Sequence, residues 1–164
     1  MNIVVRTASG KVVVRPDTTW ERDNEDFYVP EFVDGLSAAK VLYVHVSKPG
    51  RSVGEKFAER YYDGFGRGVL LYPEELLDGS EEGYACASCL DHTSFLPGQY
   101  ADKETLSPEE RALACETIAL VTRYCYIRIG DLIAIETTPR EHLCSRSEKE
   151  ATVNEGDCSF RIIF

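Results

Sequence analysis

Two cysteines and a histidine in the middle of the chain have types and spacing suited to binding a metal. Cys86 and Cys89 are separated by two residues, and His92 follows three positions later. Two thiolates and an imidazole at this spacing are ligands that Zn²⁺ accepts, and His142 or Cys144 would be candidates for a fourth ligand. Strong zinc signals have two such halves and this chain has one clear half. The competing prediction is therefore a loop with two small, partly buried thiols.

Two further places carry polar side chains that could act in a site. His45 lies in the apolar run YVHVS, where a lone histidine is more often a core or edge residue with its hydrogen bonds satisfied. Arg60 begins a polar and aromatic cluster that continues through residues 61–63, and local packing is the alternative reading of that cluster. The acidic run from Glu74 to Glu82 is expected to be a solvated face.

The composition restricts the classes of partner. The chain has 164 residues, of which 43% are hydrophobic and 28% are charged, which fits one folded domain spanning residues 1–164. Its net charge of −10 argues against nucleic acid, which needs basic surface, and against an anionic membrane. The chain has no apolar run long enough to span a bilayer and no apolar stretch typical of a signal peptide. We expect a cytoplasmic protein whose six cysteines are reduced thiols.

The first half of the chain reads mainly as strands. IVVRT and KVVVR flank a turn at residues 8–10 and predict a hairpin within residues 1–15. Residues 16–31 are polar and contain two prolines, which favours a loop. The run from Lys40 to Ser47 predicts a strand buried on both faces. GEKFAERYYDG predicts a short helix or turn that ends at the glycines of residues 64–68, and GVLLY predicts another short strand.

The second half contains the clearest helix. Residues 74–105 give no clear pattern. Ser107 is a predicted N-cap, Pro108 suits the first helical position and Glu110 completes a capping box. The expected apolar face of this helix consists of Leu113, Leu120, Val121 and Tyr124. YIRIGDLIAIE predicts a strand, a turn and a strand, and SFRIIF closes the chain as a strand, so the fold class is α+β and mainly β.

Three segments, taken in order, resemble the fumarylacetoacetate hydrolase family. RPDTTWERDNEDFYVPEF is similar to the family's basic residue, proline, loop and "fYiPdF"-like stretch, and GEKFAERYYDGFGRG is similar to a "EKFAhrYYDeiGlG" pattern. IRIGDLIAIETTP and VNEGDCSFRI resemble the family's C-terminal "GDLI-TGTP" strand and its final "GD" hairpin. The resemblance covers about two thirds of the chain. It implies a mixed β-roll, a homodimer, and an N-terminus shorter than the family's, without its His and Glu motif.

The resemblance also implies a metal-dependent chemistry that this sequence does not support. Family members hold Mg²⁺, Mn²⁺ or Ca²⁺ with carboxylates and cleave or rearrange small oxo-acids, while the ion stabilises enolate-like charge. The alignment places Ala39 and Val41 at the family's Glu-x-Glu and Leu70 at its following Asp. No acid lies from Gly35 to Gly54 or between Asp63 and Glu74, so a shift in alignment does not restore the ligands.

Other positions depart from the family pattern as well. The family's active-site lysine falls near Ser88, and Asp91 matches the turn that follows it. Glu136 replaces a glycine of the "TGTP" stretch, where it is expected to crowd the pocket, and Thr137 matches. If the site were rebuilt for catalysis, its candidate residues would be Asp91, Glu136, Arg60 and His45, and they should converge on one pocket.

Three hypotheses remain open from the sequence. The first is a non-catalytic family homologue, a pseudoenzyme that acts as a binding or dimerisation module and needs no cofactor. The second is a hydrolase or isomerase of small oxo-acids, of the fumarylacetoacetate hydrolase or 2-hydroxyhepta-2,4-diene-1,7-dioate isomerase type, with Mg²⁺ or Mn²⁺ and a rebuilt site. The third is a module held together by zinc at Cys86, Cys89 and His92. We favour the first, because apolar residues in place of all three ligands remove the carboxylate repulsion that an absent ion would leave.

Overall fold

The structure is a computed structural model that describes residues 1–164. The valine and isoleucine runs at the start of the chain form the predicted hairpin. Its turn is closed by Gly10, which has a φ of 81° that favours glycine. The hairpin is one edge of a nine-stranded sheet whose main path has the order β2-β1-β9-β5-β6-β7-β3, with β10 paired to β5 and β8 paired to β6. The strands of this sheet are β1 (Ile3–Arg6), β2 (Val12–Arg15), β3 (Trp20–Glu21), β5 (Gly35–Val46), β6 (Tyr62–Pro73), β7 (Ser94–Phe95), β8 (Ala101–Asp102), β9 (Leu132–Glu136) and β10 (Glu141–Ser145).

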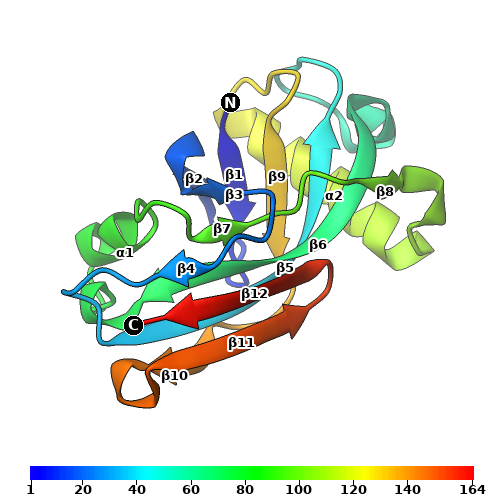
Figure 1. Ribbon diagram of the computed structural model, residues 1–164. Helices are drawn as coiled ribbons and strands as arrows, with labels where there is room; N and C mark the ends of the chain where they lie inside the picture. Colours follow the sequence, from blue (N-terminus) through cyan, green and yellow to red (C-terminus); the bar gives the residue numbers. More distant parts are fainter.

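A smaller sheet and the helices pack around this curled sheet. The smaller sheet has the order β11-β12-β4, and its strands are β4 (Phe27–Tyr28), β11 (Glu150–Glu155) and β12 (Cys158–Ile163). The two α-helices are α1 (Glu81–Ala87) and α2 (Pro108–Tyr124). The short 3-10 helices are η1 (Asp17–Thr19), η2 (Glu55–Tyr61), η3 (Glu74–Leu76), η4 (Lys103–Thr105) and η5 (Arg146–Glu148). The predicted α+β, mainly β class is confirmed (Figure 1).

The two central strands are longer than the sequence predicts. β5 begins at Gly35 rather than Lys40, and β6 continues through the glycines of residues 64–68, which were expected to end an element. These glycines lie inside the strand because other chain segments approach it closely. A Cβ on Gly66 would meet the Tyr43 ring, and one on Gly68 would meet the Phe95 carbonyl oxygen.

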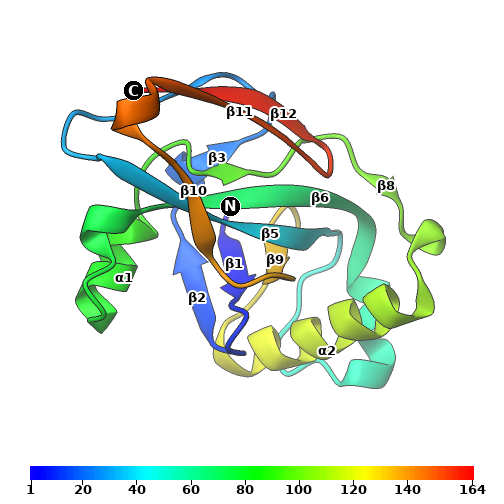
Figure 2. The same cartoon turned by 90° about the horizontal axis from the view of Figure 1, so that it is seen from below.

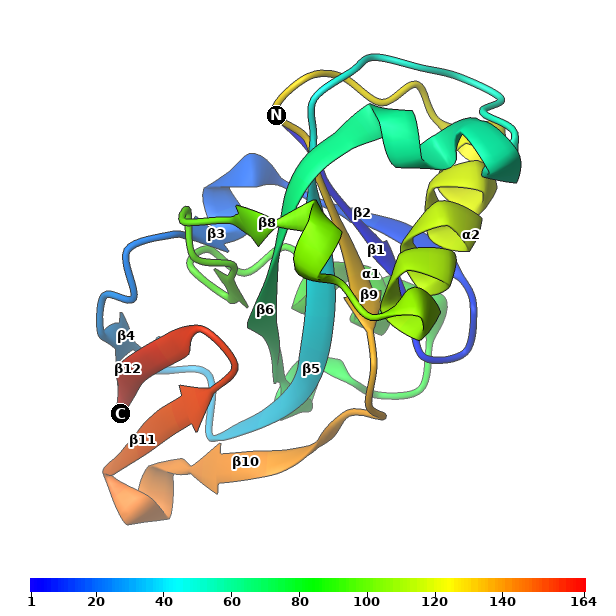
Figure 3. The ribbon, with the colours of Figure 1, turned by 90° about the vertical axis from the view of Figure 1, so that its right-hand side faces the viewer.

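The sheet curls so that its inner face encloses one apolar cluster. This cluster contains Ala39, Val41 and Tyr43 of β5, Leu70 and Tyr72 of β6, and Ala87 of α1. The outer face is covered in two places, by α2 and by the β11–β12 hairpin. Figures 2 and 3 show these two elements on opposite sides of the molecule, with the curled strands β5 and β6 between them. The inner cluster is therefore enclosed by the sheet and by α1.

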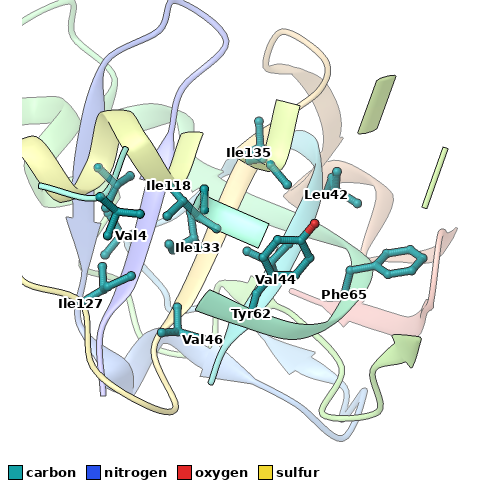
Figure 4. Packing of buried hydrophobic residues seen from close by; sticks show 14 of the residues in the cluster. Val4, Leu42, Val44, Val46, Tyr62, Phe65, Ile118, Ile127, Ile133 and Ile135 are labelled. Carbon is teal, nitrogen blue, oxygen red and sulfur yellow. The ribbon is translucent and has the colours of Figure 1, made fainter. Parts of the chain in front are cut away.

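Helix α2 forms as predicted, but its buried face differs from the expected one. Ser107 and Glu110 make both hydrogen bonds of the capping box. The buried residues of α2 include Ile118 and Val121, which pack with strand residues such as Ile133 and Ile135 (Figure 4). Tyr124, predicted to be on the apolar face, is 67% exposed and is the last residue of α2. No helix in the structure is both long enough and apolar enough to cross a membrane.

Two segments correct the sequence analysis in other ways. The unreadable stretch 74–105 contains α1, whose N-cap is Ser80. The first half of YIRIGDLIAIE makes only one isolated bridge, between Gly50 and Ile127, so that strand prediction is wrong. Only residues 132–136 form a strand there, because the chain before them crosses the end of the molecule instead of joining the sheet.

Candidate functional site

The three positions that the resemblance assigns to metal ligands lie together on the inner face of the sheet. Ala39 on β5 is directly opposite Leu70 on β6, and Val41 lies two residues along β5 on the same face. All three are buried, with exposed fractions of 0%, 0% and 2%, and they belong to one apolar cluster. The three side chains therefore form continuous core.

One carboxylate reaches this face from the neighbouring strand. Glu136 on β9 is paired with Val41, so its side chain lies on the same face of the sheet. The Tyr72 hydroxyl donates to Glu136 Oε1 at 2.6 Å, and the Ala8 backbone N–H donates to Oε2 at 2.8 Å. Burial raises the pKa of Tyr72 well above its usual value, so this hydroxyl stays a donor. The acid expected to crowd the pocket is instead held by two hydrogen bonds.

A buried arginine packs against the ring of Tyr72. Arg15, at the end of β2, is fully buried, and its guanidinium carbon lies 4.4 Å from the centroid of the Tyr72 ring. It donates to the carbonyl oxygens of Leu71 and Thr93 and to the Ser94 hydroxyl, at 2.9–3.1 Å. Its Nε has no partner, and no carboxylate lies within ion-pair distance of the guanidinium. The cation is therefore stabilised by neutral oxygens and by an aromatic face.

Beside this network lies a pocket of about 880 Å³, between the β1–β2 hairpin and α1. Lys11 and Arg140 supply positive charge to its wall, and Glu81 supplies one negative charge. The Arg140 guanidinium carbon lies 4.7 Å from the Tyr84 ring centroid and 5.2 Å from that of Tyr72. Tyr84 also stacks on Tyr72, and its hydroxyl is buried without a hydrogen-bond partner. Ser88, the position that the resemblance gives to the family's lysine, is another lining residue.

A divalent ion does not fit the residues present here. Mg²⁺, Mn²⁺ and Ca²⁺ require several oxygen ligands. Ala39, Val41 and Leu70 offer none, and both oxygens of Glu136 are already bonded to Tyr72 and Ala8. The structure contains no group of three or more His, Cys, Asp or Glu side chains placed to hold a metal ion. No catalytic step through an ion can be derived from this geometry.

The four candidates for a rebuilt active site lie in different places. His45 lies near the C-terminal end of β5, six residues after Ala39. Its Nδ1 shares a 2.7 Å hydrogen bond with Asp63 Oδ1, and its ring stacks on Tyr100. Arg60 lies on the surface in η2, and Asp91 is exposed in the turn after α1. Of the four, only Glu136 lies beside Val41, its cross-strand partner; His45 shares the inner face but lies at the other end of β5. The structure therefore does not bring the four together on one pocket.

The zinc candidates occupy one neighbourhood but do not converge. Cys86 and Cys89 are exposed, in the last turn of α1 and just beyond it. His92 lies in the following turn with a φ of 56°, and its Nδ1 is 3.2 Å from Glu21 Oε2. Cys144, considered as a fourth ligand, is buried in another cluster with Leu36 and Phe160. The His92 ring is thus hydrogen-bonded to the Glu21 carboxylate, and it does not form a metal-binding group with the thiols of Cys86 and Cys89.

The most informative residues of the site were missed by sequence reasoning. Arg15 and Tyr72 lie in runs that look like ordinary strand ends, and Arg140 follows Pro139 in what reads as a loop. One signal was available for Arg15, a charged residue that ends the apolar run VVVR directly before a proline. No local pattern shows that Arg15 and Arg140 both approach the Tyr72 ring, because the contacts join segments far apart in the sequence.

Sequence comparison gives no matching family model and no matching curated protein. Solved structures do match. A protein of the fumarylacetoacetate hydrolase family from Yersinia pestis aligns over 99% of this chain and 92% of its own, with a TM-score of 0.80 and 14% identity. Fumarylpyruvate hydrolase from Pseudomonas aeruginosa, solved with Mn²⁺ and pyruvate, aligns over 100% of this chain and 90% of its own, with a TM-score of 0.74 and 13% identity.

A third match has an isomerase activity in its name. The 2-hydroxyhepta-2,4-diene-1,7-dioate isomerase from Mycobacterium marinum aligns over 99% of this chain and 74% of its own, with a TM-score of 0.73 and 12% identity. At such identities the likeness establishes the fold alone. The chain has the fold of these hydrolases and isomerases, as the sequence resemblance implies.

Proposed function

We propose that this protein is a non-catalytic, metal-independent binding module built on the fumarylacetoacetate hydrolase fold. The observation that carries the proposal is the replacement of all three expected ligands by Ala39, Val41 and Leu70 within continuous core. A site with one altered ligand would still present carboxylates to water or to an ion. Here the apolar side chains pack against each other, so the fold gains burial instead of electrostatic repulsion.

The ligand that we propose for this module is a small carboxylic or oxo-acid. The pocket beside Tyr84 has a volume within the range of small-molecule sites. Arg140 and Lys11 form no ion pair within the chain, so their charges are available to an anion. The Pseudomonas hydrolase with the same fold was solved with pyruvate, a small oxo-acid, together with Mn²⁺. In this chain, arginine and lysine would provide the positive charge that an ion would otherwise supply.

The module is also proposed to be a homodimer, as the resemblance implies. This part of the proposal concerns assembly and does not depend on the ligand. Light scattering after gel filtration distinguishes a dimer from the 18.4 kDa monomer.

The experiment that tests the function is titration calorimetry with pyruvate as the probe, in EDTA and in millimolar Mn²⁺. We expect the same weak binding in both buffers, because no step of recognition uses an ion. Arg140→Gln should abolish the binding, since it removes the pocket's arginine charge while the Arg15–Tyr72 contact remains. Arg123→Gln is the matched control, because Arg123 is exposed on α2 and does not line the pocket.

Two results would contradict the proposal in separable ways. Binding of pyruvate only with Mn²⁺, or metal-dependent consumption of fumarylpyruvate, would show that an oxygen-ligand site survives and that the module is an enzyme. Absence of pyruvate binding in both buffers, with no effect of Mn²⁺ on the melting temperature, would overturn the ligand class and leave metal independence standing.

A further inference from the structure

Two segments far apart in the sequence form one end of the molecule. Gly50 and Ile127 exchange two backbone hydrogen bonds of 3.0 Å, and the Ser52 N–H donates to the Thr122 carbonyl oxygen at 2.8 Å. These bonds join residues 48–60 to residues 122–129. Figures 1 and 3 show the loop after β5 and the loop before β9 side by side at this end. We call the exposed part of these two segments the Tyr124 surface.

The Tyr124 surface is basic on an acidic protein. Its two segments hold six cations and two acids, a net charge of +4, which leaves −14 for the remainder of a chain with a net charge of −10. The six cations are Lys48, Arg51, Lys56, Arg60, Arg123 and Arg128, all exposed and none in an ion pair. Of the two acids, Glu59 is bonded to Arg111 at 2.6 Å. The positive charge of this surface is therefore not neutralised by the chain itself.

Large apolar side chains lie among these cations. Phe57, Tyr124, Tyr126 and Ile129 are 43%, 67%, 51% and 67% exposed. Ile127 is fully buried in the cluster beneath α2, so its neighbours Tyr126 and Arg128 face solvent on either side of it. Four of the eight exposed large hydrophobic side chains of the protein thus lie on two adjoining segments. Tyrosine and arginine are among the residues enriched at the energetic centres of protein interfaces.

We propose that the Tyr124 surface binds an acidic segment of a partner protein that also carries apolar side chains. Carboxylates of such a segment would pair with Arg123 and Arg128, and its apolar side chains would pack on Tyr124 and Tyr126. Long-range electrostatic attraction would raise the rate of association with the partner. The contacts of its apolar side chains with the aromatic rings would supply most of the affinity. The inference is independent of the pocket beside Tyr84, because none of these residues lines that pocket.

The charge distribution favours this occupant over the alternatives. A two-fold symmetric contact with a second copy would place the same basic patch against itself, which like charges oppose. A nucleic acid or an anionic bilayer extends beyond the patch and would meet the acidic remainder of the molecule. A short acidic peptide segment is confined to the patch, where the attraction is local.

The test is selection of random twelve-residue peptides displayed on phage against the intact protein, followed by fluorescence anisotropy with the most enriched peptide. We expect enriched peptides that are net acidic and contain aromatic or aliphatic residues. Their affinity should fall with added salt and fall at least about tenfold, or 1.4 kcal/mol, in Arg123→Glu/Arg128→Glu. The matched control is Arg22→Glu, an exposed arginine outside the Tyr124 surface, which should bind the peptide like the wild type.

The remaining outcomes overturn the proposal. Enriched peptides without acidic bias, or equal binding by Arg123→Glu/Arg128→Glu, would show that the surface is not the recognition site. Binding of the wild type but not of this variant to phosphatidylserine vesicles, without acidic peptide enrichment, would assign the surface to a membrane instead. A dimer that Tyr124→Asp converts to a monomer would assign it to a second copy of the chain.

Discussion

Ala39 of β5 and Leu70 of β6 form a directly opposed cross-strand pair, and both side chains are completely buried. The sequence resemblance assigns both positions to ligands of one divalent ion. The two aligned segments therefore lie side by side at these positions, and Val41 belongs to the same apolar cluster. On the assignment that the resemblance implies, the three ligand positions would be core in this chain.

Restoring the three carboxylates tests this geometry. We expect Ala39→Glu/Val41→Glu/Leu70→Asp to be destabilised by several kcal/mol in EDTA, because it buries charges without partners. Mn²⁺ should raise its melting temperature, since ligands at i, i+2 and the opposed residue can reach one ion. The control is Ala39→Gln/Val41→Gln/Leu70→Asn, which has similar volume and no charge. An equal response of both variants to Mn²⁺ would mean that the three positions do not converge on an ion site.

The hydrogen bond between Tyr72 and Glu136 gives a second prediction. Tyr72→Phe leaves a buried carboxylate with one donor fewer, which should lower the free energy of unfolding by about 1–3 kcal/mol. Tyr124→Phe removes a hydroxyl from an exposed ring and should change it by less than about 0.5 kcal/mol. Urea unfolding measures both. Similar stability of the two variants would show that Glu136 does not depend on Tyr72.

Glu110 makes stability depend on pH in the acid range. Burial acts to raise its pKa, but hydrogen bonds from Ser107 and Arg67 outweigh burial and leave the pKa below its usual value of 4.5. Since the folded pKa is the lower one, the stabilisation is present above about pH 4.5 and is lost as pH falls through the folded pKa. The Arg67–Glu110 ion pair is partly exposed to solvent. We therefore expect its contribution to the free energy of unfolding to be less than about 1 kcal/mol.

Urea unfolding from pH 7 to pH 3 checks this assignment. Glu110→Gln should be less stable than the wild type at pH 7, and the difference should shrink towards pH 3. Glu109→Gln, which alters an exposed neighbour without an ion pair, should keep the wild-type pH dependence. A constant difference across the range for Glu110→Gln would contradict the role of its charge.

The six thiols should react in an order set by burial. Burial raises the pKa of Cys144 to about 11 and that of Cys158 to about 12, whereas Cys86 and Cys89 are exposed. At pH 8 an aromatic disulfide reagent should modify Cys86 and Cys89 first, and Cys144 and Cys158 only after unfolding. Cys86→Ser/Cys89→Ser should lose the fast phase. Zn²⁺ should not protect these two thiols, because His92 is bonded to Glu21; protection would support the zinc module.

Local patterns were enough to predict some of the fold. The hairpin, α2 with its capping box and the closing strand depend on signals within a few residues, and all three are present. The family resemblance correctly implied the fold, although no family model matches the sequence. It also assigned Ala39 and Leu70 to one ion site; the two residues form a cross-strand pair, and the assignment itself stays a prediction.

What the sequence could not predict depends on contacts between distant segments. The Tyr72 ring is approached by Arg15 and Arg140, which lie 57 and 68 positions away in the chain. Tyr124 follows the apolar period of α2 but is the last residue of the helix and is exposed, so the period alone predicted its burial wrongly. Glycines 64, 66 and 68 looked like the end of an element, whereas they mark where other segments touch β6.

The last prediction concerns that close approach. A Cβ on Gly68 would meet the Phe95 carbonyl oxygen and, at 2.8 Å, a methyl group of Leu96. Because a backbone oxygen in the neighbouring strand cannot move away freely, Gly68→Ala should lower the free energy of unfolding by about 1–3 kcal/mol. Gly98→Ala is the matched control, since its Cβ would make only ordinary contacts of 3.7 Å or more and φ is not positive. This control should be neutral or should stabilise the protein by about 0.4–1 kcal/mol through the unfolded state. Urea unfolding of both variants decides the point, and a Gly68→Ala protein as stable as Gly98→Ala would show that β6 and β7 can separate at this position without cost.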